Sequence, residues 1–144
     1  MVNFFRAGQE LYFADLPGYG YARVPEAVRQ GWERLVVSYL DNRDPLVLCV
    51  FLVDARHEPM EGDEMLRAYL EDRRLPYVLA ANKADKLGHG ERAQRLAGLR
   101  RWTGPRGRDV FAVSGRDGTG IDTLWAAIRG AAAEHRAHSR QRKG

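Results

Sequence analysis

The sequence predicts an α/β domain built on a mostly parallel, doubly wound sheet with helices on both faces. Apolar runs of strand length alternate along the chain with segments of helical periodicity. Two of these runs, 46–53 and 77–81, are apolar throughout, and the longer run at 46–53 is as expected for a parallel strand that is covered on both faces. Polar turns follow the strands, and ligands bind at the carboxyl ends of the strands in such sheets.

Composition limits the class of protein. A chain of 144 residues fits one domain and can bury a core, and 44% hydrophobic residues is ordinary for a globular protein. No apolar run approaches the roughly 20 residues of a membrane span, and the N-terminus lacks a signal-peptide pattern. Cys49 is the single cysteine and lies in an apolar run, so we expect a core residue in a cytoplasmic protein.

The first third of the chain predicts a hairpin followed by a helix. Residues 3–5 and 11–14 have the composition of two strands, and the turn between them contains Gly8. A glycine-rich turn at 16–22 follows, Pro25 then opens a helix, and Asp44-Pro45 ends it. Apolar residues at helical spacing give this helix one apolar face. They are Val28, Trp32, Leu35, Val36, Tyr39 and Leu40.

The remaining elements alternate strand and helix. After the strand at 46–53 and the polar loop at 54–59, we expect a second helix, a strand at 77–81 and a third helix at 91–102. A short strand at 110–113 and a last helix from about Ile121 complete the domain. The residues expected to face inward from the second and last helices are Met65, Leu66, Tyr69, Leu70, Leu124, Trp125 and Ile128.

The C-terminus carries a local concentration of positive charge. We expect one domain over 1–134 and a basic, solvated tail over 135–144. The net charge of the chain is +4, and its basic residues are mostly arginine, which suits contacts with RNA phosphates.

The most informative stretch is Asn82-Lys83-Ala84-Asp85, an N-K-x-D turn after an apolar strand. A fixed Asp85 carboxylate can accept two adjacent N–H donors, and guanine offers such a pair in N1–H and its exocyclic amine. Adenine offers an acceptor and a C–H there, so Asp85 would select guanine. Asn82 would connect neighbouring loops, and the stem of Lys83 would lie along the base. Taken alone, four residues also fit a solvated turn that caps a helix.

A second motif, Asp15-Leu16-Pro17-Gly18, again follows an apolar strand. The Asp15 carboxylate can hold Mg²⁺ through a water beside a phosphate site. Gly18 lacks a Cβ, so its backbone N–H can approach a terminal phosphate closely. A plain Pro-Gly turn is the alternative. The third element, Ser114-Gly115, follows Val113 at the end of a later strand. Its N–H groups could reach the guanine carbonyl, and a simple nest-like turn is the alternative.

These three elements occur in the order used by Ras-like GTPases, and the run DLPGYGYARV from residue 15 resembles the switch stretch of the EngB family. This family, also called YihA or YsxC, comprises bacterial ribosome-biogenesis GTP-binding proteins of the TrmE–Era–EngA–EngB–septin group. The resemblance covers nearly the whole chain. Other stretches that fit are residues 3–5, 53–59, 81–87 and 120–122.

The resemblance implies a Ras-like P-loop fold, GTP or GDP as ligand, and Mg²⁺. It assigns magnesium and the γ-phosphate to Asp15–Gly18, guanine specificity to Asn82–Asp85, and the base carbonyl to Ser114-Gly115 after Val113. It also implies a GTPase switch in assembly of the large ribosomal subunit, with rRNA as partner, and an association with septum formation and the cell cycle. We expect a monomer that does not engage a membrane.

The chain contains no G-x-x-x-x-G-K-[ST] phosphate loop, and its first lysine is Lys83. We therefore expect an N-terminally truncated family member that lacks the first strand and the phosphate loop. Hydrolysis is left open, because Tyr19 stands where Ras-like enzymes often have glutamine, and Arg23 is only a conceivable charge stabiliser. The alternative is a ribosome- or RNA-binding remnant, or a truncated fragment, without GTPase activity.

Overall fold

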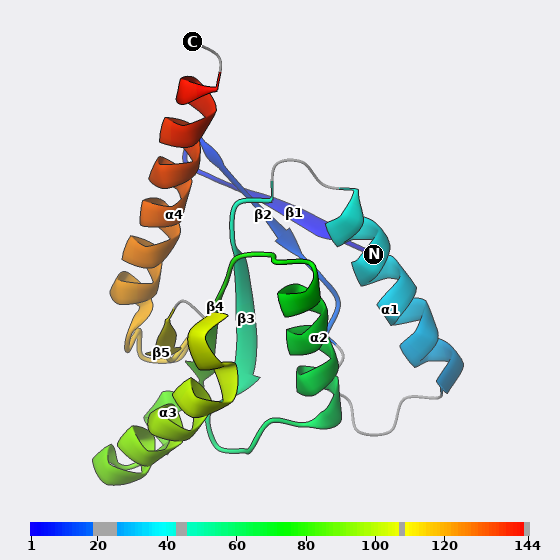
Figure 1. Cartoon of the computed structure of the whole chain (residues 1–144). Helices are drawn as coiled ribbons and strands as arrows, with labels where there is room; N and C mark the ends of the chain where they lie inside the picture. The colour runs from blue at the N-terminus through cyan, green and yellow to red at the C-terminus, as the bar shows by residue number, and fades with distance from the viewer. Residues whose placement is uncertain (19–25, 43–45, 107–108, 143–144) are drawn as a thin grey trace. The chain divides into compact units, whose positions relative to one another are not determined.

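The computed structural model describes residues 1–18, 26–42, 46–106 and 109–142 (Figure 1). They form two compact units, Met1–Leu46 and Val47–Gly144, and each is described by itself. Pro25 and Asp44-Pro45, on which the expected limits of the first helix rest, lie outside the described residues.

The first unit contains the expected hairpin and helix. Strands β1 (Asn3–Ala7) and β2 (Leu11–Asp15) pair antiparallel, and Phe5 lies opposite Phe13. Gly8 has a φ of 67°, in the left-handed region that favours glycine, so the turn explains its position. Helix α1 (Glu26–Asp41) buries Val36 and Leu40 from its predicted apolar face.

The second unit is built on a three-stranded parallel sheet, which confirms the predicted fold class. Its strands are β3 (Cys49–Asp54), β4 (Tyr77–Asn82) and β5 (Val110–Ala112), in the order β3-β4-β5. The central strand β4 is buried from Tyr77 to Ala81. Its continuous apolar run therefore lies where both faces of the sheet are covered. The cover on both faces that was expected for the run at 46–53 is wrong for β3, because its Leu52 is 58% exposed while Phe51 and Val53 are buried.

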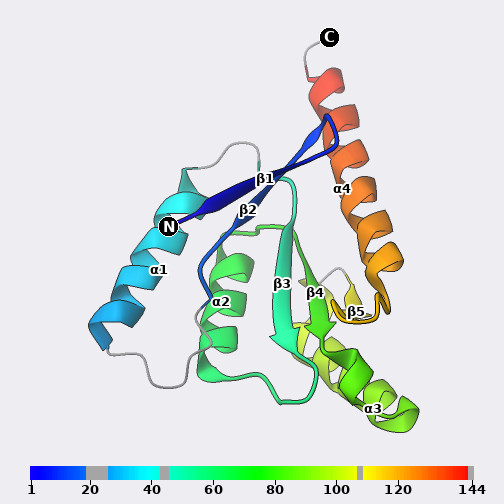
Figure 2. The ribbon, with the colours of Figure 1, turned by 180° about the vertical axis from the view of Figure 1, so that it is seen from behind.

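Three helices accompany this sheet: α2 (Glu61–Asp72), α3 (His89–Thr103) and α4 (Ile121–Gln141). Figures 1 and 2 both show α2 on the β3 side of the sheet and α4 on the β5 side. Ring contacts join α3 to β3 and α2 to α3. The Phe51 ring meets Trp102 of α3 edge-on at 6.0 Å between centroids, and the Arg67 guanidinium of α2 lies 5.0 Å from the Trp102 ring.

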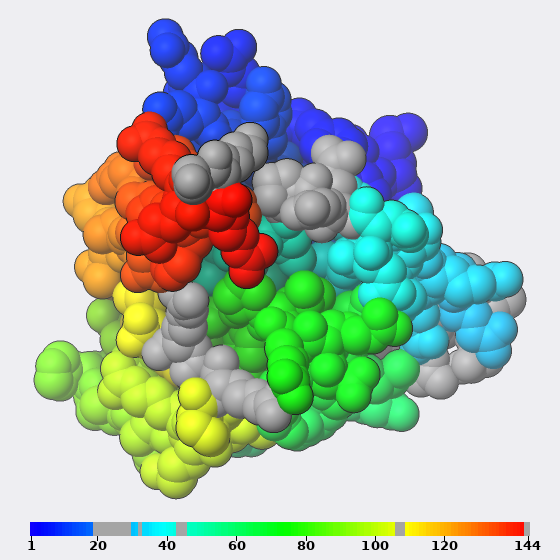
Figure 3. Space-filling model, turned by 45° about the horizontal axis from the view of Figure 1, so that its top comes forward, coloured from blue at the N-terminus to red at the C-terminus, as the bar shows by residue number. Residues whose placement is uncertain are grey.

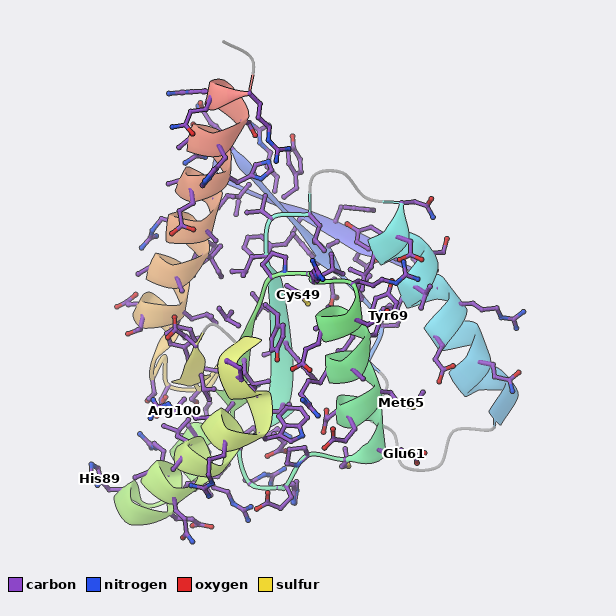
Figure 4. The ribbon with its side chains drawn as sticks, viewed as in Figure 1. Cys49, Glu61, Met65, Tyr69, His89 and Arg100 are labelled. Carbon is purple, nitrogen blue, oxygen red and sulfur yellow. The ribbon has the colours of Figure 1, made fainter. Side chains whose placement is uncertain are left out.

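Two expectations about side chains need comment. The inward position predicted for Met65 is wrong, because Met65 is 39% exposed and lies on the side of α2 away from β3 (Figure 4). Leu70 of the same face is fully buried, as predicted. Cys49 is partly exposed as a residue, but burial raises the pKa of its thiol to about 11, so the thiol is protonated at neutral pH.

Helix α4 begins at Ile121 as expected and continues without a break to Gln141. Residues 135–141, where we expect the basic tail to begin, are therefore part of this helix. The alanine run at 131–133 favours this continuation because alanine has the highest helix propensity. Figure 3 shows the last turns of α4 at the molecular surface, and no described helix is long and apolar enough to cross a membrane.

Candidate functional site

The carboxyl ends of three parallel strands meet at one edge of the second unit. Asp54 of β3 lies opposite Asn82 of β4, and Ala81 of β4 lies opposite Ala112 of β5. The loop after β4 is joined to the loop after β5 by backbone hydrogen bonds, since the N–H of Ala84 donates to the carbonyl of Val113 at 3.0 Å. The strand-end side chains predicted in this unit are thus brought together.

Asp85 is held by a serine from the neighbouring loop. The Ser114 hydroxyl donates to Asp85 Oδ1 at 2.8 Å, and Ser114 is fully buried. The same hydroxyl oxygen accepts from the backbone N–H groups of Arg116 at 3.2 Å and Asp117 at 3.3 Å. Within the described part of the chain, Ser114 is the only donor to the Asp85 carboxylate. The carboxylate is therefore oriented but keeps acceptor capacity for a ligand.

Asn82 connects the same two loops. Its Oδ1 accepts from the backbone N–H of Lys83 at 2.8 Å and, at the long distance of 3.4 Å, from that of Gly115. Lys83 itself has a φ of 62°, which is uncommon for a residue with a Cβ and marks a tight, specified turn. The side chain of Asn82 thus stabilises the turn that presents Asp85.

Lys83 is directed toward the end of β3 by an acidic partner. Its ammonium lies 3.0 Å from Asp54 Oδ2. The Arg56 guanidinium donates twice to the Asp54 carboxylate, at 3.0 and 2.8 Å. The Arg56 side chain, its backbone N–H and Lys83 together hold the pKa of Asp54 well below its usual range. Asp54 was not predicted as a site residue, although its position at a strand end carried the same signal as Asn82.

The loop after β5 leaves one N–H group for a ligand. The N–H of Ser114 already donates to the carbonyl of Thr119 at 2.9 Å, so of the expected pair only Gly115 retains a weakly engaged donor. Gly120 closes this loop with a φ of 69°, and a Cβ there would lie 1.9 Å from the carbonyl oxygen of Ala112. A glycine is therefore required at this position.

Arg92 also reaches the loop that carries Asp85. It lies in the first turns of α3, and its Nη2 donates to the carbonyl of Ala84 at 2.8 Å. Sequence reasoning missed this residue, because nothing in the spacing of an arginine eight positions after Ala84 shows that its side chain folds back onto the loop.

The second predicted motif belongs to the first unit. Asp15 ends β2 and is exposed, Leu16 and Pro17 are half-buried, and Gly18 is exposed with open space where a Cβ would lie. Residues 19–25, which include Tyr19 and Arg23, lie outside the described residues. The described residues contain no group of three or more His, Cys, Asp or Glu side chains that could hold a metal ion by themselves.

Similar proteins place this geometry in a family. No protein-family model matches the chain. The chain is 38% identical over 129 residues to the "Probable GTP-binding protein EngB" of Lactococcus lactis subsp. cremoris strain SK11, covering 89% of this chain and 66% of that protein. The chain belongs to the EngB family. Proteins of the same name from Exiguobacterium sibiricum and Anaeromyxobacter sp. strain K are 37% and 43% identical over 88% and 85% of this chain.

The EngB likeness extends to the fold. The crystal structure of a probable GTP-binding protein EngB matches with a TM-score of 0.78 at 18% identity, covering 92% of this chain and 82% of that one. Together with the parallel sheet, this match confirms the expected Ras-like P-loop fold. The chain spans 66% of the Lactococcus and Exiguobacterium EngB proteins and 56% of the Anaeromyxobacter protein.

Proposed function

We propose that this EngB family member binds GTP and GDP, and that Asp85 selects the guanine base. The observation that carries the proposal is the Asp85 carboxylate at the carboxyl edge of the parallel sheet, fixed by the buried Ser114 hydroxyl at 2.8 Å. Ligands bind at this edge in α/β sheets. The EngB relatives are named as GTP-binding proteins, which supports a guanine nucleotide as the ligand.

Three residues at the carboxyl edge of the sheet would each contact a different part of the guanine base. The Asp85 carboxylate accepts the guanine N1–H and the exocyclic amine. Gly115 donates its N–H to the guanine carbonyl, exchanging its long 3.4 Å bond to Asn82 for a shorter one. The stem of Lys83, anchored at its ammonium by Asp54, covers one face of the base. Each contact uses a group that the described loops already hold in place.

Mg²⁺ and the γ-phosphate are assigned to Asp15–Gly18. Magnesium in nucleotide sites keeps several waters and binds one or two carboxylates plus phosphate oxygens, so a single exposed carboxylate such as Asp15 fits it. The open surroundings of Gly18 suit a backbone N–H that contacts phosphate. Bound magnesium would neutralise phosphate charge, while Asp15 would hold one of its waters.

The cellular role follows from the family resemblance. We infer a slow GTPase switch that acts in assembly of the large ribosomal subunit, with rRNA as partner and a link to septum formation and the cell cycle. We further propose that the protein acts in the cytoplasm as a monomer. The exposed residues Arg136 and Arg140 of α4, and Arg142 directly after it, supply positive charge suited to RNA phosphates.

A titration with fluorescent GDP and GTP tests the nucleotide proposal, with ADP as competitor and with and without Mg²⁺. We expect binding that excess GDP displaces and excess ADP does not, and tighter GTP binding when Mg²⁺ is present. The proposal would be contradicted if the folded protein binds neither GDP nor GTP. It would also be contradicted if ADP displaces the fluorescent nucleotide as well as GDP does. RNA binding that is sensitive to salt but unaffected by nucleotide would instead favour the RNA-binding alternative.

A further inference from the structure

We propose that Arg92 is a positioning residue for guanine recognition, which fixes the loop of Asp85 against the loop of Ser114. The inference rests on the proposed guanine site, which it deepens by adding a residue that touches neither base nor phosphate. It assigns to α3 a part in nucleotide specificity beyond its packing on the sheet.

The first observation is the contact between Arg92 and the base-reading turn. Arg92 Nη2 donates to the carbonyl of Ala84, the residue immediately before Asp85, at 2.8 Å. Ala84 is fully buried, and its N–H donates to the carbonyl of Val113 at 3.0 Å. The peptide groups on both sides of Ala84 are therefore held, one by the loop after β5 and the other by Arg92. The Ala84 carbonyl also accepts from the Leu87 N–H at 3.2 Å, so loss of the Arg92 bond would leave it with this longer bond only and loosen the turn that aims the carboxylate.

The second observation is the environment of the guanidinium. Arg92 Nε is buried and has no acceptor among the described residues. A buried, unpaired N–H costs free energy, so packing alone would not favour an arginine at this position. The Nη2 contact to the Ala84 carbonyl offsets part of that cost.

The third observation places the same charge near the loop after β5. The pKa of Asp117 is lowered mainly by the hydrogen bonds of Thr119, and the positive charge of Arg92 is the smallest of the contributions. Asp117 lies three residues after Ser114, in the turn whose N–H groups bind the Ser114 hydroxyl. Arg92 therefore contacts the Asp85 loop directly, and only its charge reaches the loop after β5.

A comparison of GDP with inosine diphosphate measures this role directly. Hypoxanthine lacks the 2-amino group of guanine, so the ratio of the two affinities reports the contact between that amine and Asp85. A hydrogen bond to a carboxylate gives a wild-type ratio of roughly 10 to 100. We expect Arg92→Met to lower the ratio about fivefold or more, because hydrogen bonds weaken steeply when their geometry is lost.

The matched control is Arg95→Met. Arg95 lies one turn further along α3 and forms an ion pair with Glu58 at the loop after β3, away from Ala84. We expect Arg95→Met to lower the melting temperature without changing the affinity ratio. A ratio that stays at the wild-type value in Arg92→Met, or that falls equally in both variants, would overturn the inference. If Arg92→Met does not fold, Arg92→Lys, which keeps a cation, replaces it.

Amide hydrogen exchange without nucleotide separates this inference from the proposed function. Arg92→Met should accelerate exchange across residues 83–88 relative to Arg95→Met, since the Leu87 N–H also donates to the Ala84 carbonyl. Equal exchange in the two variants would contradict the role of Arg92 even if wild-type protein binds GDP. Faster exchange only in Arg92→Met would support the role of Arg92 in holding the Asp85 loop, whether or not the wild-type protein binds a guanine nucleotide. Failure of the wild-type protein to bind any guanine nucleotide would refute the proposed function alone.

Discussion

Removal of the Ser114 hydroxyl by Ser114→Ala tests whether the candidate site is an integral part of the fold. The hydroxyl donates to the Asp85 carboxylate at 2.8 Å and accepts from two backbone N–H groups at 3.2 and 3.3 Å, inside a fully buried residue. Water has no access to replace it there, so the three groups lose their shared partner together.

The magnitude follows from these contacts. A hydrogen bond to a charged group contributes about 1.5–3 kcal/mol, and the two longer N–H bonds add less, because Asp85 itself is partly exposed and regains some hydration. We expect Ser114→Ala to lower the free energy of unfolding by about 2–3 kcal/mol.

Urea denaturation followed by circular dichroism measures this free energy. Ser139→Ala, on the helix α4 of the same unit, is the matched control and should stay within about 0.5 kcal/mol of wild type. An effect of Ser114→Ala no larger than that of Ser139→Ala, at an unchanged m-value, would refute the reasoning, because the hydroxyl would then contribute nothing to the fold.

Three further predictions concern the fold around the site. Gly120→Ala places a Cβ 1.9 Å from a backbone oxygen, so it should lower the free energy of unfolding in urea by at least about 3 kcal/mol. The control Gly118→Ala, whose Cβ meets open space, should lower it by about 1–2 kcal/mol. Equal losses in the two variants would contradict the close contact at Gly120. Burial raises the pKa of Tyr77 to about 12, so the protonated tyrosine stabilises the fold below about pH 10 and this stability is lost as the pH rises toward 12. Tyr77→Phe should make the melting temperature fall less steeply between about pH 10 and pH 12 than it does in wild type. A slope equal to that of wild type would contradict the raised pKa of Tyr77. The Arg56 side chain holds the pKa of Asp54 well below its usual range, so this carboxylate stabilises the fold above about pH 4 and the stability is lost below it. Asp54→Asn should therefore make the fall of the melting temperature below about pH 4 less steep. A fall as steep as that of wild type would contradict the pairing of Asp54 with Arg56.

Local pattern was sufficient to predict the elements. The apolar run at 77–81 indicated a strand, and the polar residues after it indicated a turn at the ligand edge of the sheet, because strand and turn formation both depend on neighbouring residues. The pattern failed for Met65. Its spacing along the helix predicted an inward side chain like that of the buried Leu70, but Met65 is exposed. A helix periodicity shows which residues share a face, but not how far the partner surface extends.

The contacts that shape the candidate site were beyond the sequence pattern. Ser114 and Asp85 are separated by 29 positions, and Lys83 and Asp54 by the same number, so only the pairing of the strands brings them together. Arg92 depends on a side-chain conformation that no spacing rule encodes. Sequence reasoning therefore identified the residue types of the site, while the hydrogen bonds that orient them depend on the tertiary structure.

The most direct test of the central claim is to exchange the base preference through Asp85→Asn. An asparagine replaces one acceptor with an N–H donor, and xanthine carries a carbonyl where guanine carries its amine. Two charge-assisted bonds of about 1.5–3 kcal/mol each are at stake, so GDP affinity should fall roughly 100-fold or more. We predict that the variant loses GDP and binds xanthosine diphosphate more tightly than wild type does. A variant that keeps wild-type GDP affinity would show that Asp85 does not read the base and would contradict the account.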